Sequence, residues 1–438
     1  MPSALTIAGS DSVGGAGLQA DLKAFAAVGV HGCSVITCVT SQNTRRVSSI
    51  FPLPIAEIES QLDSVLEDVK LDAVKTGMLY SDEIVVAVAR KIRKGVGPLV
   101  VDPVLAASTG ASLRSTGLVE AMISKLMPLC TLITPNLPEA REISGIDIRD
   151  EKTAREAGFE ILEMGAGGVL IKGGHMKGPD AADYLFVGDK VKKFATPRAW
   201  GDAHGTGCAF ASLIAGHLAL DYDIEESVRR SKRMIFKAIV AKQVVGKGIP
   251  CADPLAALRI DAGKVLMLEQ LGDAGTELEG LLNSDLTPEV GSNMGYSVTG
   301  ALDADEVAAF DGRIVRTNRG ARAVGSPRFG ASKHVARIIL AAQCHDPSTR
   351  CALNLKYSES NLEACRAAKL SVMSFDRARE PKGVSSMTWG VHKAIQKHGG
   401  IPDVIYDRGG VGKEPMIRIL GRSPEDVLQK LKRMKSKL

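Results

Sequence analysis

The sequence predicts an α/β protein, with a large domain built on a mostly parallel sheet followed by a second, smaller α/β domain. Through residues 1–250, short β-rich runs alternate with amphipathic helical runs. Several of the expected strands are apolar throughout, as in sheets that helices cover on both faces. Near residue 260 the composition shifts to a proline-flanked stretch, after which a second strand–helix series begins. We therefore place the domains at residues 1–260 and 261–438.

Polar residues follow several of the expected strands in the first domain. The strands are predicted in Leu5–Ala8, Ser34–Val39, Ala73–Gly77, Leu99–Val101, Leu132–Asn136 and Gly168–His175, and the helices between them around 16–28, 55–69 and 84–92. Ligands of open parallel sheets bind beyond the carboxyl ends of the strands. The polar clusters are therefore expected to meet at one edge of the sheet and to form an active site there.

The second domain is expected to continue the alternation on a smaller scale. Its strands are predicted near Arg313–Arg316, Cys351–Tyr357, Leu370–Phe375, Val404–Tyr406 and Met416–Leu420, and its helices near Asp303–Phe310, His334–Cys344, Met387–His398 and Pro424–Leu438. The last helix ends in lysines and an arginine, which complement the helix dipole. We expect this terminus to be a solvated surface and not a nucleic-acid site.

Composition narrows the classes of function. The chain has 438 residues and a formal net charge of +5, which is too small to argue for a nucleic-acid partner. No stretch reaches transmembrane length, and Met1–Ile7 lacks the basic start of a signal peptide, so we expect a cytoplasmic protein without a membrane partner. The eight cysteines are scattered, with no Cys-x-x-Cys pair, which argues against structural zinc and against a disulfide framework.

One glycine-dense stretch, Trp200–Phe210, runs from a polar loop into an apolar helix. Glycines at a helix start let backbone amides approach an anion, and the helix dipole adds positive charge at the same point. Gly205, Thr206 and Gly207 are therefore a candidate anion hole for a phosphoryl group. Cys208 falls in the first helical turn, where the pKa of a thiol is expected to fall. Alternatively, the glycines serve tight packing and Cys208 is a small buried residue.

Neither common nucleotide-binding loop is present. Ala8–Asp21 follows the first strand but is not Gly-x-Gly-x-x-Gly, and Gly409–Glu414 has glutamate where a Walker A loop has serine or threonine. The first 260 residues or so resemble hydroxymethylpyrimidine/phosphomethylpyrimidine kinase, within the ribokinase-like fold. The motifs that carry this resemblance are Ala8–Ser12, Gln19–Lys23, Ser41–Thr44, Val101–Val104, Thr134–Glu139 and His204–Cys208, in that order.

The resemblance implies which residues bind the substrate. Gly9, Asp21 and Gln42 would bind the aminopyrimidine, because an amide can pair with adjacent donor and acceptor edges. Cys208 would lie near the hydroxyl or phosphate that attacks. For Asp21, an exposed position on a helix is the structural alternative.

The resemblance also implies a site for ATP. Asp102 and Glu139 would act on the Mg²⁺ that accompanies ATP, directly or through water, because Mg²⁺ binds few carboxylates and keeps several waters. Lys172 would contact phosphate. Mg²⁺ is thus the expected cofactor, with ATP as co-substrate.

Basic residues gather between residues 313 and 334. They are Arg313, Arg316, Arg319, Arg322, Arg328, Lys333 and His334. Gly330–Ser332 leads from them into a predicted helix, and arginines that converge at a helix N-terminus suit a phosphate or diphosphate. A solvated basic face is the alternative.

Residues from about 270 to 425 resemble the archaeal-type thiamine-phosphate synthase domain that is found fused to this kinase. The matching motifs are Gly291–Tyr296, Gly312–Arg316, Phe329–Arg337, Phe375–Arg377, Met387–Gly390, Pro402–Asp407 and Gly412–Pro415. The implied reaction joins pyrimidine diphosphate to thiazole phosphate and releases pyrophosphate, with Arg313 and His334 stabilising the leaving group. Alternatively, the domain is a non-catalytic sensor of a thiamine-pathway ligand; the kinase upstream favours the synthase.

The expected partners are therefore small molecules: hydroxymethylpyrimidine, ATP and thiazole phosphate. We expect the protein to be a homo-oligomer.

Overall fold

The computed structural model describes residues 1–92, 96–105, 115–174, 176, 178–318, 320–380, 386–410 and 412–438. His175, at the end of a predicted strand, and Arg319, in the basic run, lie outside the described residues. The chain divides into two compact units, Met1–Leu258 and Arg259–Leu438, which we call the N-terminal and C-terminal units. The sequence-based division falls between residues 260 and 261.

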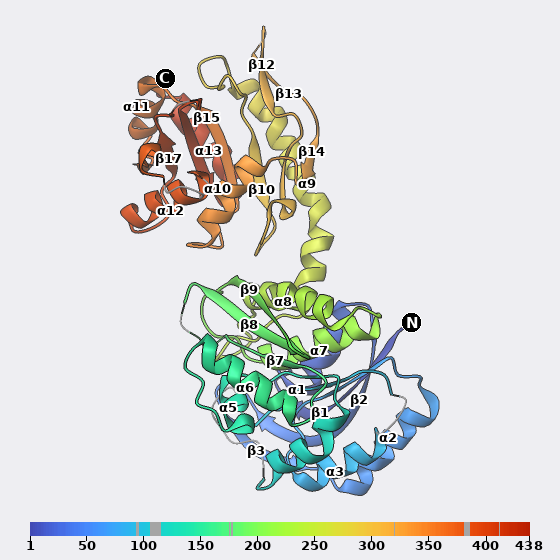
Figure 1. Cartoon of the computed structure of the whole chain (residues 1–438). Helices are drawn as coiled ribbons and strands as arrows, with labels where there is room; N and C mark the ends of the chain where they lie inside the picture. Colours follow the sequence, from blue (N-terminus) through green and yellow to red (C-terminus); the bar gives the residue numbers. More distant parts are fainter. Residues whose placement is uncertain are drawn as a thin grey trace. The chain divides into compact units, whose positions relative to one another are not determined.

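A nine-stranded sheet runs through the described part of the N-terminal unit (Figure 1). Its strands are β1 (Ser3–Asp11), β2 (His31–Gln42), β3 (Val47–Pro52), β4 (Ala73–Thr76), β5 (Leu99–Val101), β6 (Leu132–Ile133), β7 (Val169–Ile171), β8 (Asp180–Val187) and β9 (Lys190–Pro197). In the order β3-β2-β1-β4-β5-β6-β7-β8-β9, neighbours from β2 to β7 are parallel, whereas β3, β8 and β9 pair antiparallel at the edges. The mostly parallel sheet is confirmed, and the three antiparallel edge strands are additions to the predicted set.

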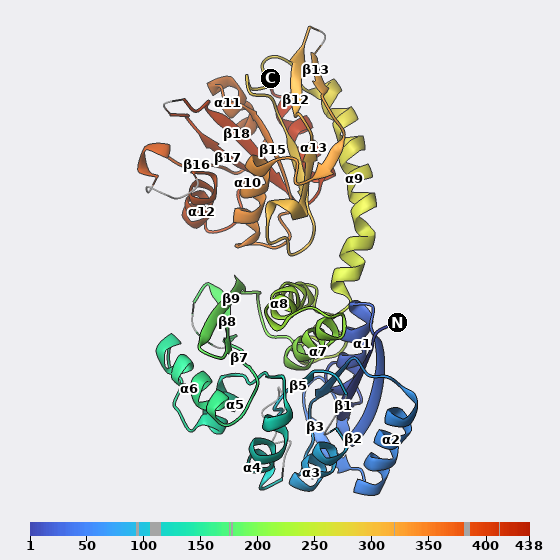
Figure 2. The same cartoon turned by 45° about the vertical axis from the view of Figure 1, so that its right-hand side comes forward.

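Helices cover both faces of this sheet (Figure 2). They are α1 (Gly17–Ala27), α2 (Ile55–Asp68), α3 (Asp82–Lys91), α4 (Leu118–Ala121), α5 (Leu137–Ser144), α6 (Glu151–Glu163), α7 (Thr206–Ala219) and α8 (Ile224–Val240), and a short π-helical and 3-10 turn, Met122–Leu129, follows α4. Side chains alternate across each strand. In β4, Ala73 packs with α1, α7 and α8, while Val74 packs with α2 and α3 on the other face.

The C-terminal unit holds a seven-stranded sheet and a two-stranded sheet in its described part. The larger sheet has the order β14-β11-β10-β15-β18-β17-β16, and β12 pairs with β13. Its strands are β10 (Met294–Ser297), β11 (Val307–Phe310), β12 (Ile314–Thr317), β13 (Gly320–Ala323), β14 (Pro327–Phe329), β15 (Cys351–Lys356), β16 (Val372–Ser374), β17 (Val404–Asp407) and β18 (Met416–Gly421). The pairings within the larger sheet are antiparallel except β16 with β17.

Two apolar cores lie on the two faces of the larger sheet. The helices of the C-terminal unit are α9 (Ala256–Leu281), α10 (Lys333–Gln343), α11 (Glu359–Ala367), α12 (Ser386–His398) and α13 (Pro424–Lys435). Helices α9, α11 and α13 pack on one face, and α10 and α12 pack on the other. The expected fold class, a large parallel-sheet unit followed by a smaller α/β unit, is confirmed.

The helix predicted near Asp303–Phe310 is wrong. Ala304–Glu306 forms one 3-10 turn, and Val307–Phe310 is strand β11, buried at every position and paired with β10 and β14. Ala308 and Phe310 belong to one core, and Val307 to the other. A short apolar run suits a buried strand as well as a helix, and here the partner strands decide.

The stretch around Gly272–Gly275, expected to follow the domain boundary as part of a composition shift, is the middle of helix α9. A Cβ on Gly275 would lie 2.5 Å from the Phe310 ring, so the glycine allows α9 to pack closely on β11. Met267, Leu271 and Leu278 of the same helix are buried in the C-terminal core. Glycine here reflects close packing within a helix, not a loop.

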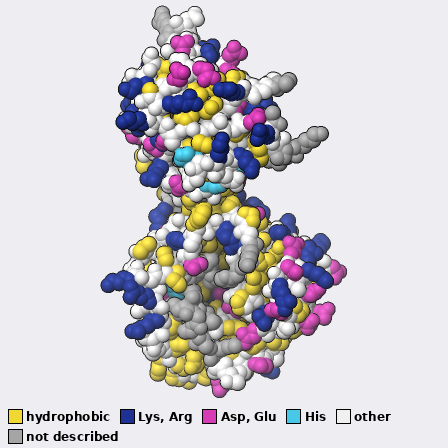
Figure 3. Space-filling model, turned by 90° about the vertical axis from the view of Figure 1, so that its left-hand side faces the viewer, with side chains coloured by type: hydrophobic (Ala, Val, Ile, Leu, Met, Phe, Trp, Pro, Cys, Tyr) yellow, Lys and Arg dark blue, Asp and Glu magenta, His cyan; other side chains and the backbone are white. Residues whose placement is uncertain are grey.

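None of the helices in the described ranges is long and apolar enough to cross a membrane. On the face drawn in Figure 3, Lys and Arg side chains are interspersed with Asp and Glu over both units.

Candidate active sites

The loop before α7 presents free backbone amides at the carboxyl edge of the parallel sheet. Gly205 caps α7 in the left-handed conformation (φ 80°), and a Cβ there would lie 1.7 Å from the Gly15 carbonyl oxygen. The first bond of the helix runs from Ala209 N to Gly205 O (3.0 Å), so the preceding amides are not used within the helix. Only glycine fits at this junction, and the geometry suits an anion.

The loop opposite is held by the side chain of Asp11 at the end of β1. Its oxygens accept hydrogen bonds from the amides of Val13 (3.0 Å), Gly15 (3.0 Å) and Ala16 (2.8 Å). Burial raises the pKa of Asp11, but the bonds from His204 and these amides outweigh burial and leave the pKa below its ordinary value. Asp11 thus organises the loop as an anion.

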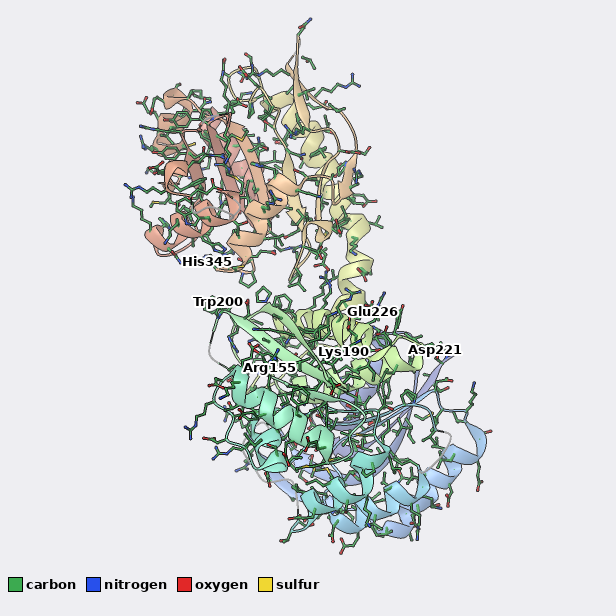
Figure 4. The ribbon with its side chains drawn as sticks, in the orientation of Figure 1. Arg155, Lys190, Trp200, Asp221, Glu226 and His345 are labelled. Carbon is green, nitrogen blue, oxygen red and sulfur yellow. The ribbon has the colours of Figure 1, made fainter. Side chains whose placement is uncertain are left out.

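Gln42 and His204 meet at this edge of the sheet. Gln42 Nε2 at the end of β2 lies 2.9 Å from His204 Nε2, and the same ring nitrogen lies 3.2 Å from Asp11 Oδ2. His204 therefore links the glycine loop to the ends of two strands, and its position fixes the Gln42 amide. Trp200, labelled in Figure 4, begins the same loop and is 64 % exposed.

The expected lowered pKa of Cys208 is wrong. Burial is the main cause that raises the pKa of this thiol, and the carboxylates of Asp102 and Asp21 act in the same direction. Lys75 and the Gly17 amide oppose them, and the resulting pKa is about 12. Desolvation therefore outweighs the helix N-terminus, and the thiol is neutral near pH 7.

Behind Cys208 lies a buried ion pair between Asp21, which the sequence predicts for the site, and Lys75, which it does not. Lys75, on β4, is completely buried, and its Nζ lies 2.9 Å from Asp21 Oδ2 on α1. Thr6 and Ser212 donate hydrogen bonds to the same carboxylate at 2.6 and 2.8 Å. Asp21 is therefore not the exposed helix residue of the alternative reading. Both of its oxygens already have protein partners.

Asp102 and Glu139 face one lysine. Lys172 Nζ lies 2.8 Å from Asp102 Oδ1, which also accepts a bond from Thr134 Oγ1 (3.2 Å). Glu139 is placed by a capping box at the start of α5, in which its side chain accepts from Asn136 N and the Asn136 side chain accepts from Glu139 N. The structure thus brings together the residues predicted to serve Mg²⁺ and phosphate.

The charges of this cluster are coupled. Burial and the Asp102 carboxylate raise the pKa of Glu139, the charge of Lys172 opposes them, and the resulting pKa is about 7. Burial also raises the pKa of Asp102, but Lys172 and Lys75 outweigh burial and leave it lowered. Lys172 is the cation that both carboxylates face. Asp102 is therefore negatively charged at neutral pH, whereas Glu139 titrates near pH 7.

The C-terminal unit contains a cavity of about 500 Å³ beside α10. Its walls include Val290, Gly291, Asn293, Arg313, Ser332, His334, Arg337, Asn354, Arg377, Glu380, Lys413 and Glu414. A neighbouring lobe of about 300 Å³ shares Asn293, Arg313, Ser332 and His334 with it and adds Gly312 and Lys333. Cationic groups outnumber carboxylates around this cavity, as an anionic substrate requires.

Arg313 and His334 lie on the wall that the two lobes share. Arg313 is one of few non-glycine residues with a positive φ (72°), and its Nη1 donates to Val290 O. Burial, together with the charges of Arg418, Arg377 and Arg313, lowers the pKa of His334 to about 4. His334 Nε2 is buried and has no hydrogen-bond partner among the described residues. The imidazole is therefore neutral at pH 7 and able to bond to a ligand.

The basic run converges only in part. Of the described members, Arg313 and His334 line the cavity, and Lys333 lines the smaller neighbouring lobe. Arg328 instead pairs with Asp311 at the surface, and Arg316 donates to Thr287 O. Arg337 of α10 also lines the cavity, and Arg377 and Lys413 reach it from segments farther along the chain. Arg377 belongs to the matched motif Phe375–Arg377, for which the sequence predicted no role.

The fold and these two sites define a small-molecule kinase of the ribokinase-like class followed by a second α/β unit with an anion-binding cavity. Residues 11–253 match the family model of phosphomethylpyrimidine kinase, and residues 270–433 match that of thiamine-phosphate synthase ThiN. The chain is 35 % identical over 428 residues to the bifunctional thiamine biosynthesis protein ThiDN of Methanocaldococcus jannaschii, covering 98 % of this chain and 97 % of that protein. It belongs to this family of bifunctional thiamine biosynthesis proteins.

Other relatives match the N-terminal unit alone. The hydroxymethylpyrimidine/phosphomethylpyrimidine kinase of Streptomyces coelicolor is 42 % identical over 253 residues, covering 58 % of this chain and 94 % of the relative. The pyridoxal kinase of Staphylococcus aureus, solved with AMP-PCP and pyridoxal, superimposes with a TM-score of 0.56 at 32 % identity, covering 59 % of this chain and 96 % of that one. The protein is an enzyme of thiamine biosynthesis with kinase and thiamine-phosphate synthase activities, as both resemblances implied.

Proposed function

We propose that the N-terminal unit transfers the γ-phosphoryl group of ATP to the hydroxymethyl oxygen of the aminopyrimidine and then to the phosphate so formed. The observation that carries this proposal is the glycine junction, where Gly205 and Gly15 leave no room for a side chain and the first amides of α7 remain available. Those amides, from Gly205 to Cys208, bind the phosphoryl group as its charge grows. Lys172 contacts phosphate, and the neutral Cys208 thiol lies beside the attacking oxygen.

Gln42 is proposed to read the pyrimidine, together with the backbone at Gly9. A Cβ on Gly9 would lie 2.7 Å from Cys38 Sγ, so close packing against β2 leaves no room for a side chain at this position. The amide of Gln42 is oriented by His204 and can pair with a donor–acceptor edge. Asp21 is proposed to act through Lys75, because its carboxylate is fully buried behind the site.

The two carboxylates at Asp102 and Glu139 fit a Mg²⁺ ion that arrives with ATP. Mg²⁺ takes one or two carboxylates and completes its shell with phosphate oxygens and water. No three His, Cys, Asp or Glu side chains converge on one point in the described ranges, so the remaining ligands would come from ATP and water. The ion would neutralise charge on the phosphates, while Lys172 holds the Asp102 carboxylate in place.

The substrate assignment is tested with Gln42→Leu. The variant is expected to bind the aminopyrimidine more weakly by about 1–3 kcal/mol, because a polar ligand edge loses its partner, while the KM for ATP stays unchanged. Pyridoxal is the competing substrate, since solved pyridoxal kinases share the fold of this unit. A higher kcat/KM for pyridoxal than for the pyrimidine in the unaltered protein would refute the assignment.

In the C-terminal unit, Arg313 and His334 are proposed to stabilise the diphosphate as it leaves. The thiazole nitrogen forms a bond to the methylene carbon of the pyrimidine diphosphate while the bond from that carbon to the diphosphate oxygen breaks. Arg313 supplies the charge, and the neutral imidazole of His334 supplies a hydrogen bond from its unpartnered Nε2. Lys333 and the start of α10 lie in the adjoining lobe and would hold the released pyrophosphate.

These roles are tested in the full chain supplied with pyrimidine diphosphate and thiazole phosphate but no ATP. Arg313→Ala and His334→Ala are each expected to suppress pyrophosphate release by on the order of a hundredfold. Arg328→Ala is the matched control, because Arg328 belongs to the same basic run but pairs with Asp311 at the surface. Equal loss in all three variants would show that the run acts only through its total charge.

We also propose that the protein acts in the cytoplasm and as a homo-oligomer. The eight cysteines, all within the described residues, form no disulfide, which suits a reducing compartment. Strand β3 is the outermost strand of its sheet, and Phe51 on it is 66 % exposed, so this edge is open to a second copy. Light scattering at micromolar concentration tests the oligomer, and the mass of a monomer would refute it.

A further inference from the structure

A buried cluster of two arginines and one aspartate stands behind one wall of the C-terminal cavity. Asp407, at the end of β17, is fully buried and accepts hydrogen bonds from Arg377 Nε (2.5 Å), Arg377 Nη2 (3.1 Å) and Gly409 N (2.8 Å). Arg418 on β18 is also completely buried, and its Nη2 lies 2.7 Å from Asp407 Oδ2. Asp407 is thus shared by two guanidinium groups.

The cluster carries an excess positive charge. One carboxylate neutralises one of the two guanidinium groups, and a charge in a low-dielectric interior needs a counter-charge. Arg418 faces the Phe375 ring (5.7 Å), and its Nε has no hydrogen-bond partner among the described residues. The positive charge that Asp407 does not neutralise is therefore carried by the guanidinium group that lines the cavity.

Arg377 is that group. It follows β16 in the sequence Phe375–Arg377, lines the cavity, and keeps a side chain that is 9 % exposed. Its fork holds Asp407 through Nε and Nη2, so its orientation is fixed. The lowered pKa of His334, caused in part by Arg377 and Arg418, shows that their field reaches the shared wall of the two lobes.

The carboxylates of the cavity are already engaged. Glu414 accepts from the amides of Glu289 (2.9 Å) and Val290 (3.3 Å), and Glu380 lies 3.4 Å from Lys413. Neither carboxylate has a bond to Arg377 in the described contacts. An anionic ligand is the counter-charge that this wall lacks.

The synthase reaction brings two anions to one cavity, a diphosphate and a phosphate monoester. The lobe beside Lys333 and the start of α10 suits the diphosphate, as proposed above. Arg377 lies in the larger lobe and is absent from the walls of the smaller one. We propose that Arg377 binds the phosphate of the thiazole substrate, and that Asp407 and Arg418 are positioning residues for it.

This proposal rests on the assignment of Arg313 and His334 to the diphosphate, and the experiment separates the two. The full chain is supplied with pyrimidine diphosphate and with either thiazole phosphate or the unphosphorylated thiazole alcohol. The ratio of kcat/KM for these two thiazoles measures recognition of the phosphate. Arg377→Ala is expected to lower this ratio roughly 10- to 100-fold, the range for a lost charge-assisted bond, with the KM for pyrimidine diphosphate unchanged. Arg377→Lys keeps the charge without the fork and should recover part of the ratio.

Two features allow the test to separate loss of phosphate binding from misfolding and from a general loss of charge. Arg377→Ala leaves Asp407 paired one-to-one with Arg418, so the cluster remains neutral and the unit should fold. Arg379→Ala is the matched control, because Arg379 lies in the same turn, is 83 % exposed and pairs with Asp376. Arg379→Ala should leave the ratio unchanged.

Calorimetric binding of thiazole phosphate completes the design, because it requires no turnover. Binding that Arg377→Ala weakens and Arg379→Ala does not supports the proposal even if the wild-type chain releases no pyrophosphate, an outcome that would refute the roles of Arg313 and His334 instead. Normal binding and an unchanged ratio in Arg377→Ala would overturn the proposal. So would a raised KM for pyrimidine diphosphate with the thiazole preference intact.

Discussion

Lys75 and Asp21 form an ion pair with 2.9 Å between Nζ and Oδ2, and neither side chain has any exposed surface. Burial lowers the pKa of Lys75, but Asp21, Cys208 and Asp102 outweigh burial and raise it, so the lysine stays charged. The pair joins β4 to α1 directly beneath the residues proposed for phosphoryl transfer. Its location links the stability of the N-terminal unit to the electrostatics of the site.

Lys75→Met is therefore expected to destabilise the protein by about 3–5 kcal/mol, because the Asp21 charge is left buried without a cation. Lys70→Met is the control: Lys70 is 92 % exposed on its side chain, and its pairing with Asp72 at 3.8 Å should matter little. Urea unfolding followed by circular dichroism measures both. Equal midpoints for the two variants would show that the buried pair contributes nothing.

Cys208 is expected to resist alkylation. Cys208 is half-buried and Cys344 is exposed, so the prediction rests on the pKa of Cys208. With a pKa of about 12, its thiolate fraction at pH 8 is on the order of 0.01 %. Mass spectrometry after brief iodoacetamide treatment should find Cys344 modified and Cys208 intact. Rapid, selective labelling of Cys208 would contradict the burial argument.

Cys208→Ala is nevertheless expected to lower pyrimidine phosphorylation by on the order of a hundredfold or more, because a preorganised group beside the reacting oxygen is lost. ATP binding should change little, and ATP affinity is the internal control. Near-normal turnover would return Cys208 to a packing role.

The sequence was informative where backbone chemistry leaves a pattern. Gly205 and Asp102, which follows β5, could be predicted as site residues. Glycines at the start of a helix and polar residues at the ends of strands can be recognised directly in the sequence. Hairpin β8–β9 had such a signal too, since Gly188-Asp189 separates two strands, and Gly188 adopts a positive φ (52°).

Other site residues could not be predicted from the sequence, because their role depends on which residues they pack against in the folded protein. Lys75 and Arg418 are single charged residues inside short, largely apolar strands. Only the structure shows that Asp21 on α1 and Asp407 on the neighbouring strand β17 pair with them. The same reason explains why β11 was predicted as a helix. Its four apolar residues form a strand because they pair with β10 and β14. A charged residue within an apolar strand indicates a buried ion pair, but the sequence does not show which residue is its partner.

His334 is expected to make stability fall in acid. The unfolded imidazole titrates near 6.5 and the folded one near 4, so the unfolded state binds the proton first. Its contribution is fully present above pH 6.5 and is lost as the pH falls toward 4. Between pH 7 and pH 5 the loss should be about 2 kcal/mol.

His334→Gln isolates this effect, because burial also lowers the pKa of His345 and of His392, and both remain in the variant. His345, labelled in Figure 4, lies 2.7 Å from His392 between their ring nitrogens. The unfolding free energy of the wild type should decline more steeply with acid than that of the variant. Parallel declines would place the titration elsewhere.

A fragment of residues 259–438 is expected to fold on its own and to make thiamine phosphate from pyrimidine diphosphate and thiazole phosphate without ATP. The fragment contains the whole of the C-terminal compact unit and both of its apolar cores. Helix α9 is essential to it, because Met267, Leu271 and Leu278 are buried against the sheet. Each such side chain contributes about 1.5–3 kcal/mol on burial.

A second fragment, residues 283–438, lacks α9 and provides the comparison. Removing the three buried side chains costs about 5–9 kcal/mol, which is comparable to the whole stability of a domain, so this fragment should be unfolded by circular dichroism and inactive. The longer fragment should unfold cooperatively and release pyrophosphate. If the shorter fragment folds and catalyses equally well, α9 is a connector and not part of the synthase core. If the longer fragment fails to fold, the C-terminal unit depends on the kinase for its stability.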